Sequence, residues 1–303
     1  MANYYNSTTR AYTDDHFSQY NSTIFNGEAR IPICFCIDTS SSMECLTNRP
    51  SDYERTGQSY TKDGNTVDSV RMKPGITPHT RIDEVQRVLS RMVTRMKADR
   101  RIANAAAICI VTFDLFADCI IEFTDVHRID QRIIRQIQAG EDHTNASKGI
   151  DMALERLDRF RNMNSRAGNE SYKPVLVFMS DGSVRNDPRA TYARNTVRER
   201  AEAGNLNVIP IGIGREVDNS WMRQLSADAR VYHMEHEDEF DKVFEIITRR
   251  IQQTLTVLSV DEEMCAASDD IPQQTDNCER STAYGSSKTV DDLSMFVDWA
   301  ADE

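Results

Sequence analysis

The sequence contains no long uninterrupted hydrophobic run. A helix that spans a bilayer needs about 20 consecutive apolar residues, and the 303-residue sequence has no such stretch. Residues 1–17 are polar and lack the apolar centre of a secretory signal peptide. We therefore expect a cytoplasmic protein that does not associate with a membrane.

The sequence also lacks the short motifs of several enzyme classes. It has no GxxxxGK phosphate-binding loop, no HExxH zinc motif and no nucleophile elbow. Its seven cysteines are an odd number, and Cys34, Cys36 and Cys109 lie inside apolar segments that read as buried strands. This use of cysteine favours a reduced, cytoplasmic environment over a disulfide framework.

The sequence has fewer basic than acidic residues, and most of this difference lies in one segment. The whole chain has a net charge of −12. Residues 261–303 contain twelve acidic and two basic residues, a charge of −10, which leaves −2 for residues 1–260. Nucleic-acid binding calls for a basic face, so we expect no nucleic-acid partner. The polar, acidic segment 261–288 is predicted to be disordered.

Four short segments are almost continuous in apolar residues, which is typical of strands buried on both faces of a parallel sheet. They are residues 31–37, 105–113, 174–179 and 207–213. Amphipathic helical patterns separate most of them. Their apolar faces are Ile82, Val85, Leu89, Met92, Val93 and Met96; Ile150, Ala153, Leu154, Leu157 and Phe160; and Phe240, Val243, Phe244, Ile247, Ile251 and Leu255. The alternation predicts an α/β fold with a doubly wound, mostly parallel sheet and helices on both faces.

One strand is expected to run in the opposite direction. The second apolar segment continues to Asp114, and only residues 115–117 then precede residues 118–123; so short a connection joins antiparallel strands. We predict an antiparallel edge strand at 118–123. A last short strand is predicted at 229–234, before the final helix.

Three polar motifs lie where the chain leaves this sheet or enters a helix. DTSSS (residues 38–42) follows the first strand, DHTN (142–145) precedes a helix and SDG (180–182) follows the third parallel strand. Such sheets bind ligands in a crevice beyond the carboxyl ends of their strands, so Asp38 and Asp181 should both face that crevice. Carboxylate and hydroxyl oxygens are hard ligands that suit Mg²⁺, Mn²⁺ or Ca²⁺ rather than zinc or copper.

The motifs DxSxS, a separate threonine and Asp-Gly, in this order, resemble the metal-ion-dependent adhesion site (MIDAS) of von Willebrand factor A (vWA) domains. The resemblance covers roughly residues 30–255 and implies a vWA, Rossmann-like fold. Its ligand positions are Asp38, Ser40, Ser42, Thr144 and Asp181. The resemblance implies that the three hydroxyls bind the ion directly and that the two carboxylates act largely through water. Mg²⁺ is the expected cation, with Mn²⁺ or Ca²⁺ as alternatives.

Two positions depart from the usual motif of the family. Ser41 stands where glycine is common, and Asp142-His143 stand where a glycine pair is common. None of these residues is an expected ligand. Ser41 removes some backbone freedom, and the negative charge of Asp142 could strengthen cation binding. The loop conformation is the part of the resemblance that these changes affect.

The expected domain organisation has three parts. Residues 1–29 form a polar N-terminal segment, residues 30–258 the vWA domain, and residues 259–303 an acidic, largely disordered tail. Within the tail, residues 290–300 have helical spacing and could dock as a short helix. Within the domain, residues 44–81 are an insertion with Asp63-Gly64 as a hairpin turn. The insertion should lie near the metal face, and a floppy surface loop is the alternative.

The resemblance implies a protein-interaction module and no catalytic residue. In the family, an Asp or Glu from a binding partner completes the coordination of the ion. Cytoplasmic bacterial vWA proteins of the tellurite-resistance type are similar in length and core motifs. They imply work with kinases, phosphatases or ATPases in stress response or defence.

Two other functions stay open at this stage. A metal-dependent phosphohydrolase would use Asp38 as its nucleophile, with His143, Asp142 and Arg185 as the nearby candidates for acid, base or phosphate-binding roles. Alternatively, the domain is a scaffold that binds partners through another face while its metal site is idle. Substitution of Asp38 separates this scaffold from a metal-dependent module.

Weaker candidates lie outside the main motifs. His233 and His236 have a spacing that suggests a metal pair, but they fall where a strand passes into a helix, and a surface role is favoured. Cys265 and Cys278 lie in the tail and are expected to be unpaired. Asp114 closes a strand at the predicted metal edge, where it could support the site or form a turn.

Overall fold

The computed structural model describes residues 30–251, except for residues 63–64, 141–142, 169–171, 183, 185–186, 215–216, 218, 235–238, 240 and 250. The described residues all belong to the first of two units into which the chain divides, residues 1–259. The expectations for residues 1–29 and for the acidic tail, with its helix and its two cysteines, concern residues outside the described part.

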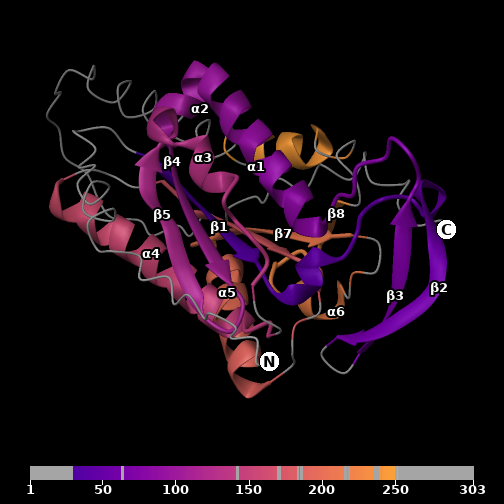
Figure 1. The fold of residues 1–303 in the computed structure, drawn as a ribbon. Coiled ribbons are helices and arrows are strands. Elements are labelled where there is room, and N and C mark those ends of the chain that lie inside the picture. The colour runs from indigo at the N-terminus through magenta and orange to yellow at the C-terminus, as the bar shows by residue number, and fades with distance from the viewer. Residues whose placement is uncertain are drawn as a thin grey trace, which may run out of the picture. The chain divides into compact units, whose positions relative to one another are not determined.

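A six-stranded sheet forms the centre of the described domain (Figure 1). Its strands lie in the order β5-β4-β1-β6-β7-β8. They are β1 (Ile31–Asp38), β4 (Ala106–Phe113), β5 (Ala117–Asp125), β6 (Val175–Ser180), β7 (Asn207–Ile213) and β8 (Tyr232–Met234). All neighbouring pairs are parallel except β4 and β5, which pair antiparallel at the sheet edge. The predicted mostly parallel sheet and its antiparallel edge strand are confirmed.

Helices cover both faces of the sheet, as predicted. The helices are α1 (Arg81–Ala98), α2 (Arg100–Ala105), α3 (Gln131–Ile134), α4 (Ala146–Arg166), α5 (Pro188–Glu202) and α6 (Asn219–Met222), and residues 241–249 are also helical. None of the helices in the described ranges is long and apolar enough to cross a membrane.

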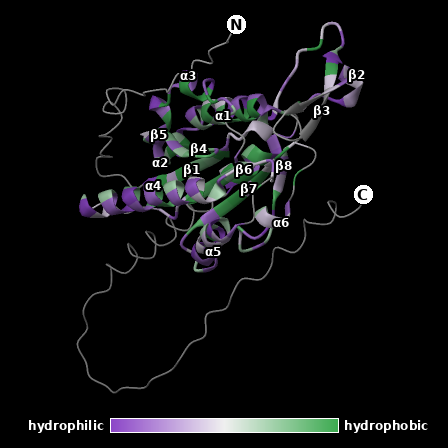
Figure 2. Ribbon diagram, turned by 60° about the horizontal axis from the view of Figure 1, so that its bottom comes forward, coloured by the Kyte–Doolittle hydropathy of each residue, from purple (hydrophilic) through white to green (hydrophobic). Residues whose placement is uncertain are grey.

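The strands divide the core into two layers because successive side chains point to opposite faces. In β1, Ile33 and Phe35 pack with α1 and the helix at 241–249, whereas Cys34 and Cys36 pack with α4, α5 and α6. Figure 2 shows this apolar sheet between helices whose outer surfaces are polar. The predicted apolar faces of α1 and α4 are buried in full. In the last helix Val243, Ile247 and Ile251 are buried, and Phe240 and Leu255 lie outside the described side chains.

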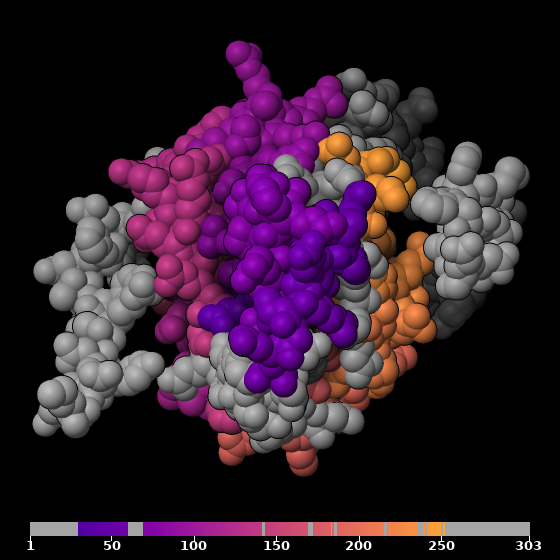
Figure 3. Space-filling view, turned by 45° about the vertical axis from the view of Figure 1, so that its right-hand side comes forward, coloured from indigo at the N-terminus to yellow at the C-terminus, as the bar shows by residue number. Residues whose placement is uncertain are grey.

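The insertion between β1 and α1 forms a separate hairpin. Strands β2 (Tyr53–Lys62) and β3 (Asn65–Met72) pair antiparallel, with Lys62 opposite Asn65. The two residues between them, where the turn is predicted, are outside the described part. The hairpin stands apart from the central sheet (Figure 1), and the indigo and purple atoms after β1 face the viewer in Figure 3. The insertion is therefore a formed hairpin and not a structureless loop.

Candidate metal centre

The two predicted aspartates lie at the carboxyl ends of adjacent strands. Strand register pairs Asp38 with Phe113 of β4, and Ile37 with Met179 of β6, so these three strands end level with one another. Asp181 follows the last residue of β6 directly. Both aspartates are completely buried. The fold therefore places two carboxyl groups at one edge of the sheet and out of contact with solvent.

Hydrogen bonds fix the orientation of Asp38. Its Oδ1 accepts from the backbone N–H of Ser40 at 2.9 Å, and its Oδ2 accepts from the hydroxyl of Ser180 at 2.6 Å. The Ser180 oxygen in turn accepts from the backbone N–H of Gly182 at 3.1 Å. Sequence reasoning did not assign Ser180, although it stands in the SDG motif. Ser180 joins the two halves of the site because it contacts Asp38 from the neighbouring strand.

The electrostatics around Asp38 favour a cation. Burial, and then the nearby charge of Asp181, raises the pKa of Asp38 from 3.8 to about 6, although hydrogen bonds from Ser180 and Ser40 act in the opposite direction. Within the described part of the chain, Asp38 receives hydrogen bonds but forms no ion pair. A divalent cation beside this carboxylate would stabilise its ionised form.

Two serine hydroxyls lie together in the loop that follows β1. Ser40 is buried and Ser42 is half-buried in the short 3₁₀ turn Ser41–Glu44, and their Oγ atoms are 3.0 Å apart. Two oxygen ligands about 2.1 Å from Mg²⁺ and at right angles would be about 3.0 Å apart. The spacing of these hydroxyls therefore fits adjacent positions around one small, hard cation.

Thr144 lies in a loop that is tied to the same edge of the sheet. The backbone N–H of Gly140 donates to the Thr39 carbonyl at 2.6 Å, and the N–H of Asn145 donates to the Asp114 carbonyl at 2.8 Å. Thr39 follows β1 and Asp114 follows β4, so both ends of the loop are held beside the site. Thr144 is half-buried in this loop.

The structure also shows a residue that the motifs did not reveal. The Arg81 guanidinium contacts Asp181 Oδ2 at 2.5 Å and the Ser42 carbonyl at 3.4 Å. Arg81 is the first residue of α1, and its side chain is only 13% exposed. A cation at the positive N-terminal end of a helix is unfavourable, so an arginine directly after the N-cap Thr80 was the available signal in the sequence.

The weaker candidates have ordinary local roles or are not described. Asp114 Oδ1 accepts from the N–H of Phe116 at 2.9 Å, which is a turn interaction. His233 is exposed and bonds to Asn219 at 2.8 Å, while His236 is outside the described residues. The described ranges contain no group of three or more His, Cys, Asp or Glu side chains arranged to hold a metal. A metal site here would therefore depend on the serine and threonine hydroxyls.

The structure thus brings four of the five predicted ligands to the same edge of the sheet and ties the loop of the fifth to that edge. The four are Asp38, Ser40, Ser42 and Asp181. Their oxygen donors, the spacing of the hydroxyls and the raised pKa of Asp38 fit a hard divalent cation. Metal binding by these residues stays a prediction.

Several solved structures are similar to this chain at low sequence identity. A mutant of the PilB minor pilin from Streptococcus sanguinis is 15% identical with a TM-score of 0.52, and the match covers 78% of this chain and 64% of PilB. BatB from Bacteroides thetaiotaomicron is 12% identical with a TM-score of 0.48, and the match covers 73% of this chain and 99% of BatB. Proximal thread matrix protein 1 from the mussel byssus, in a form described with a zinc-occupied MIDAS motif, is 16% identical with a TM-score of 0.45; the match covers 73% of this chain and 47% of that one.

The family is shown by a sequence model and not by these structures. No curated protein sequence matches the chain. The model of the von Willebrand factor type A domain matches residues 75–249, which is more than half of the sequence. The match begins near the end of the insertion, so β1 and residues 38–42 lie before it, while Thr144 and Asp181 lie within it. The position of β1 inside the sheet completes the domain, and the chain belongs to the von Willebrand factor type A domain family.

Proposed function

We propose that this protein is a metal-dependent protein-interaction module. Asp38, Ser40, Ser42, Thr144 and Asp181 would hold one divalent cation at the carboxyl edge of the sheet, and an Asp or Glu of a protein partner would complete its coordination. The observation that carries the proposal is the meeting of two fully buried carboxylates with a pair of serine hydroxyls 3.0 Å apart.

The donor set explains why such a site would bind a partner. Neutral hydroxyls next to the ion leave much of its charge uncompensated, so the ion attracts a further carboxylate. We propose Mg²⁺ as the cation, with Mn²⁺ and Ca²⁺ as alternatives. Because the partner would supply a ligand, cation affinity and partner affinity would be thermodynamically linked. The interaction would therefore depend on the cation.

We also propose that the protein is not an enzyme. A phosphohydrolase would need a general acid or base and a cationic phosphate clamp near Asp38. Of the candidates in the sequence, His143 is exposed, and Asp142 and Arg185 lie outside the described residues. Arg81 contacts the site, but it pairs with the carboxylate of Asp181.

The cellular setting is part of the proposal. We propose a cytoplasmic protein because Cys34, Cys36, Cys109 and Cys119 are buried free thiols. The resemblance to tellurite-resistance-type vWA proteins supports a bacterial stress-response or defence role with a kinase, phosphatase or ATPase as partner. We propose neither a nucleic acid nor a membrane as a partner.

Cation-dependent capture with matched variants tests the proposal. The wild type, Asp38→Ala and the control Asp241→Ala are titrated with Mg²⁺ and then used to capture partners in Mg²⁺ or in EDTA. Asp241 is a suitable control because its side chain is 63% exposed and pairs with Arg95 on the protein surface. We expect the wild type and the control to bind Mg²⁺ and to retain a partner in Mg²⁺ only, and Asp38→Ala to do neither.

The other outcomes identify the rival functions. Equal capture of the same partner by Asp38→Ala and by the wild type would favour the scaffold with an idle metal site. Phosphatase turnover that follows the concentration of the wild type and disappears in Asp38→Ala would favour the enzyme.

A further inference from the structure

Arg81 places a fixed positive charge inside the candidate metal centre. Its Nη1 atom lies 2.5 Å from Asp181 Oδ2, a predicted ligand, and 3.4 Å from the carbonyl oxygen of Ser42. Gly214, at the end of β7, makes room for the side chain: a Cβ atom at this position would lie 2.6 Å from Arg81 Nε. The guanidinium is therefore packed into the site and is not a surface group that passes near it.

Arg81 lies at a position where a buried positive charge is unfavourable. The first turn of a helix favours negative side chains, and a charge removed from water is destabilising unless a partner compensates it. Here the compensation comes from Asp181, whose side chain is 0% exposed. Arg81 and Asp181 therefore hold each other in a buried pair, and one charge of the candidate cation site is already neutralised by the protein itself.

We propose that Arg81 is an internal competitor of the divalent cation. Its guanidinium occupies Asp181 in the metal-free protein and moves away from this carboxylate when the cation binds. This inference rests on the proposed function. With Arg81 in place, the two carboxylates and the guanidinium together present a net charge of minus one to a metal ion instead of minus two. The guanidinium also repels the incoming cation. Arg81 thus lowers the affinity of the site for a divalent ion.

The base of the insertion determines where Arg81 lies. The Arg81 N–H donates to the Cys45 carbonyl at 3.0 Å, and Leu46 and Thr80 form an antiparallel bridge. One residue further, the Thr47 N–H donates to the His79 carbonyl at 2.9 Å. These contacts form a short stem, residues 45–48 with 77–81, between the β2–β3 hairpin and the site.

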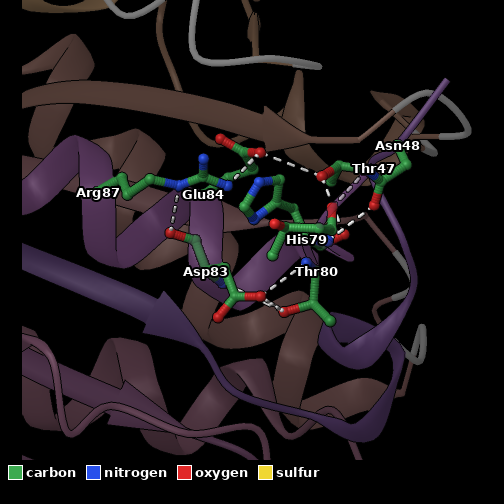
Figure 4. Close-up of polar contacts among 8 residues, drawn as sticks. Thr47, Asn48, His79, Thr80, Asp83, Glu84 and Arg87 are labelled. Carbon is green, nitrogen blue, oxygen red and sulfur yellow. Dashed lines mark hydrogen bonds and ion pairs between the residues drawn. The ribbon is translucent and has the colours of Figure 1, made fainter. Parts of the chain in front are cut away.

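Hydrogen bonds between polar side chains connect the stem to α1 (Figure 4). The buried Thr47 hydroxyl donates to Glu84 at 3.1 Å, and Glu84 pairs with Arg87 at 2.7 Å. Asn48 Oδ1 accepts from the His79 N–H at 2.7 Å. One strand of the stem continues from the serine loop, and the other ends at Arg81. The insertion therefore links the loop that carries the serine hydroxyls to Arg81 through a few backbone hydrogen bonds.

The test is a cation titration of three full-length proteins by calorimetry. Arg81→Gln removes the charge but keeps hydrogen-bond donors, and Arg91→Gln removes a charge from the same helix, where Arg91 lies 3.9 Å from Asp241. Removing the guanidinium charge leaves the charge of Asp181 uncompensated and ends the repulsion of the incoming cation. We therefore expect Arg81→Gln to bind Mg²⁺ or Mn²⁺ about 10- to 100-fold more tightly than the wild type, and Arg91→Gln to bind like the wild type.

The outcomes separate this inference from the proposed function. Cation binding by the wild type with equal or weaker binding by Arg81→Gln would overturn the role of Arg81 alone. Absence of binding by all three proteins would overturn the proposed function and this inference with it.

A second measurement needs no variant, in case Arg81→Gln does not fold. Crystal structures of the wild type in EDTA and in saturating Mg²⁺ are compared. We expect Arg81 to contact Asp181 in EDTA and to lie beyond hydrogen-bond distance in Mg²⁺. An Arg81–Asp181 pair that is intact beside a bound cation would refute the competition.

Discussion

Asp38→Asn should make the metal-free protein more stable at neutral pH. The substitution removes the charge from a carboxyl group that is completely buried. The amide oxygen can accept from the Ser40 N–H, and the amide NH₂ can donate to the Ser180 oxygen, which reverses the direction of the second hydrogen bond. In the wild type the Ser40 N–H and the Ser180 hydroxyl donate to Asp38 at 2.9 and 2.6 Å. The substitution therefore removes the charge and keeps the size and shape of the side chain.

The size of the effect follows from the pKa of Asp38, which is raised from 3.8 to about 6 in the folded protein. Between these values the folded state binds more protons than the unfolded state, so stability falls as the pH rises from about 4 to about 6. One pKa unit corresponds to about 1.4 kcal/mol, so the ionised carboxylate destabilises the metal-free fold by about 3 kcal/mol at pH 7.5. At pH 4.5 about 1 kcal/mol of this effect is already present.

Urea unfolding in EDTA measures the difference directly. We expect Asp38→Asn to exceed the wild type by about 3 kcal/mol at pH 7.5 and by about 1 kcal/mol at pH 4.5. The surface control Asp241→Asn should change stability by less than about 0.5 kcal/mol. In Mg²⁺ at 100 times its Kd the wild type and Asp241→Asn should each gain about 2.7 kcal/mol, and Asp38→Asn should gain nothing. A variant that is less stable than the wild type in EDTA at pH 7.5, or whose advantage does not depend on pH, would refute this reasoning.

Three further predictions concern the groups that support the site and the core. Ser180→Ala removes the hydroxyl that orients Asp38. Calorimetry should show that this variant binds the cation about 10- to 100-fold more weakly than the wild type, which is the usual effect of removing a group that positions a metal ligand. Thr47→Val should lower the free energy of unfolding by about 1–3 kcal/mol because it breaks the buried bonds of the stem, whereas Thr56→Val in the exposed hairpin should change it by less than about 0.5 kcal/mol. Gly149→Ala should destabilise the protein by about 1–3 kcal/mol in urea unfolding despite the better helix propensity of alanine, because its Cβ would lie 2.5 Å from the Phe113 ring; a more stable variant would contradict this packing.

Much of the sheet could be predicted from the sequence because its strands are buried on both faces. A continuous apolar run such as IPICFCI in β1 has few other interpretations when polar loop motifs bound it. Helices α1 and α4 were predictable for a related reason: each has a wide apolar face at helical spacing. Helix α5 gave no such signal. It packs through Ala190, Ala193 and Val197, residues too small to mark a face.

The contacts within the site were harder to predict from the sequence. The aspartates and serines stand next to strand ends, so the order of motifs indicated where they would meet. Arg81 reaches Asp181 across 100 positions of the sequence, and nothing local specifies that pairing. Glu84 is a similar case. It lies on the buried side of α1, where an acidic residue is unexpected, and the hydroxyl of Thr47 in the insertion donates a hydrogen bond to it. Both contacts depend on the path of the insertion, which local sequence patterns do not specify.

The place of β1 in the sheet has a consequence for how the protein is made. Its partners come much later in the chain: Ile31 pairs with Ala106 of β4, and Ile33 with Val175 of β6. At a synthesis rate of about 5–20 residues per second, roughly 7–30 s pass before the second partner exists. During this time an apolar, strand-forming segment has open edges, which is the condition that chaperones counter. The centre of the sheet and the cation site are thus completed together and late, since neither can form before Asp181 has left the ribosome.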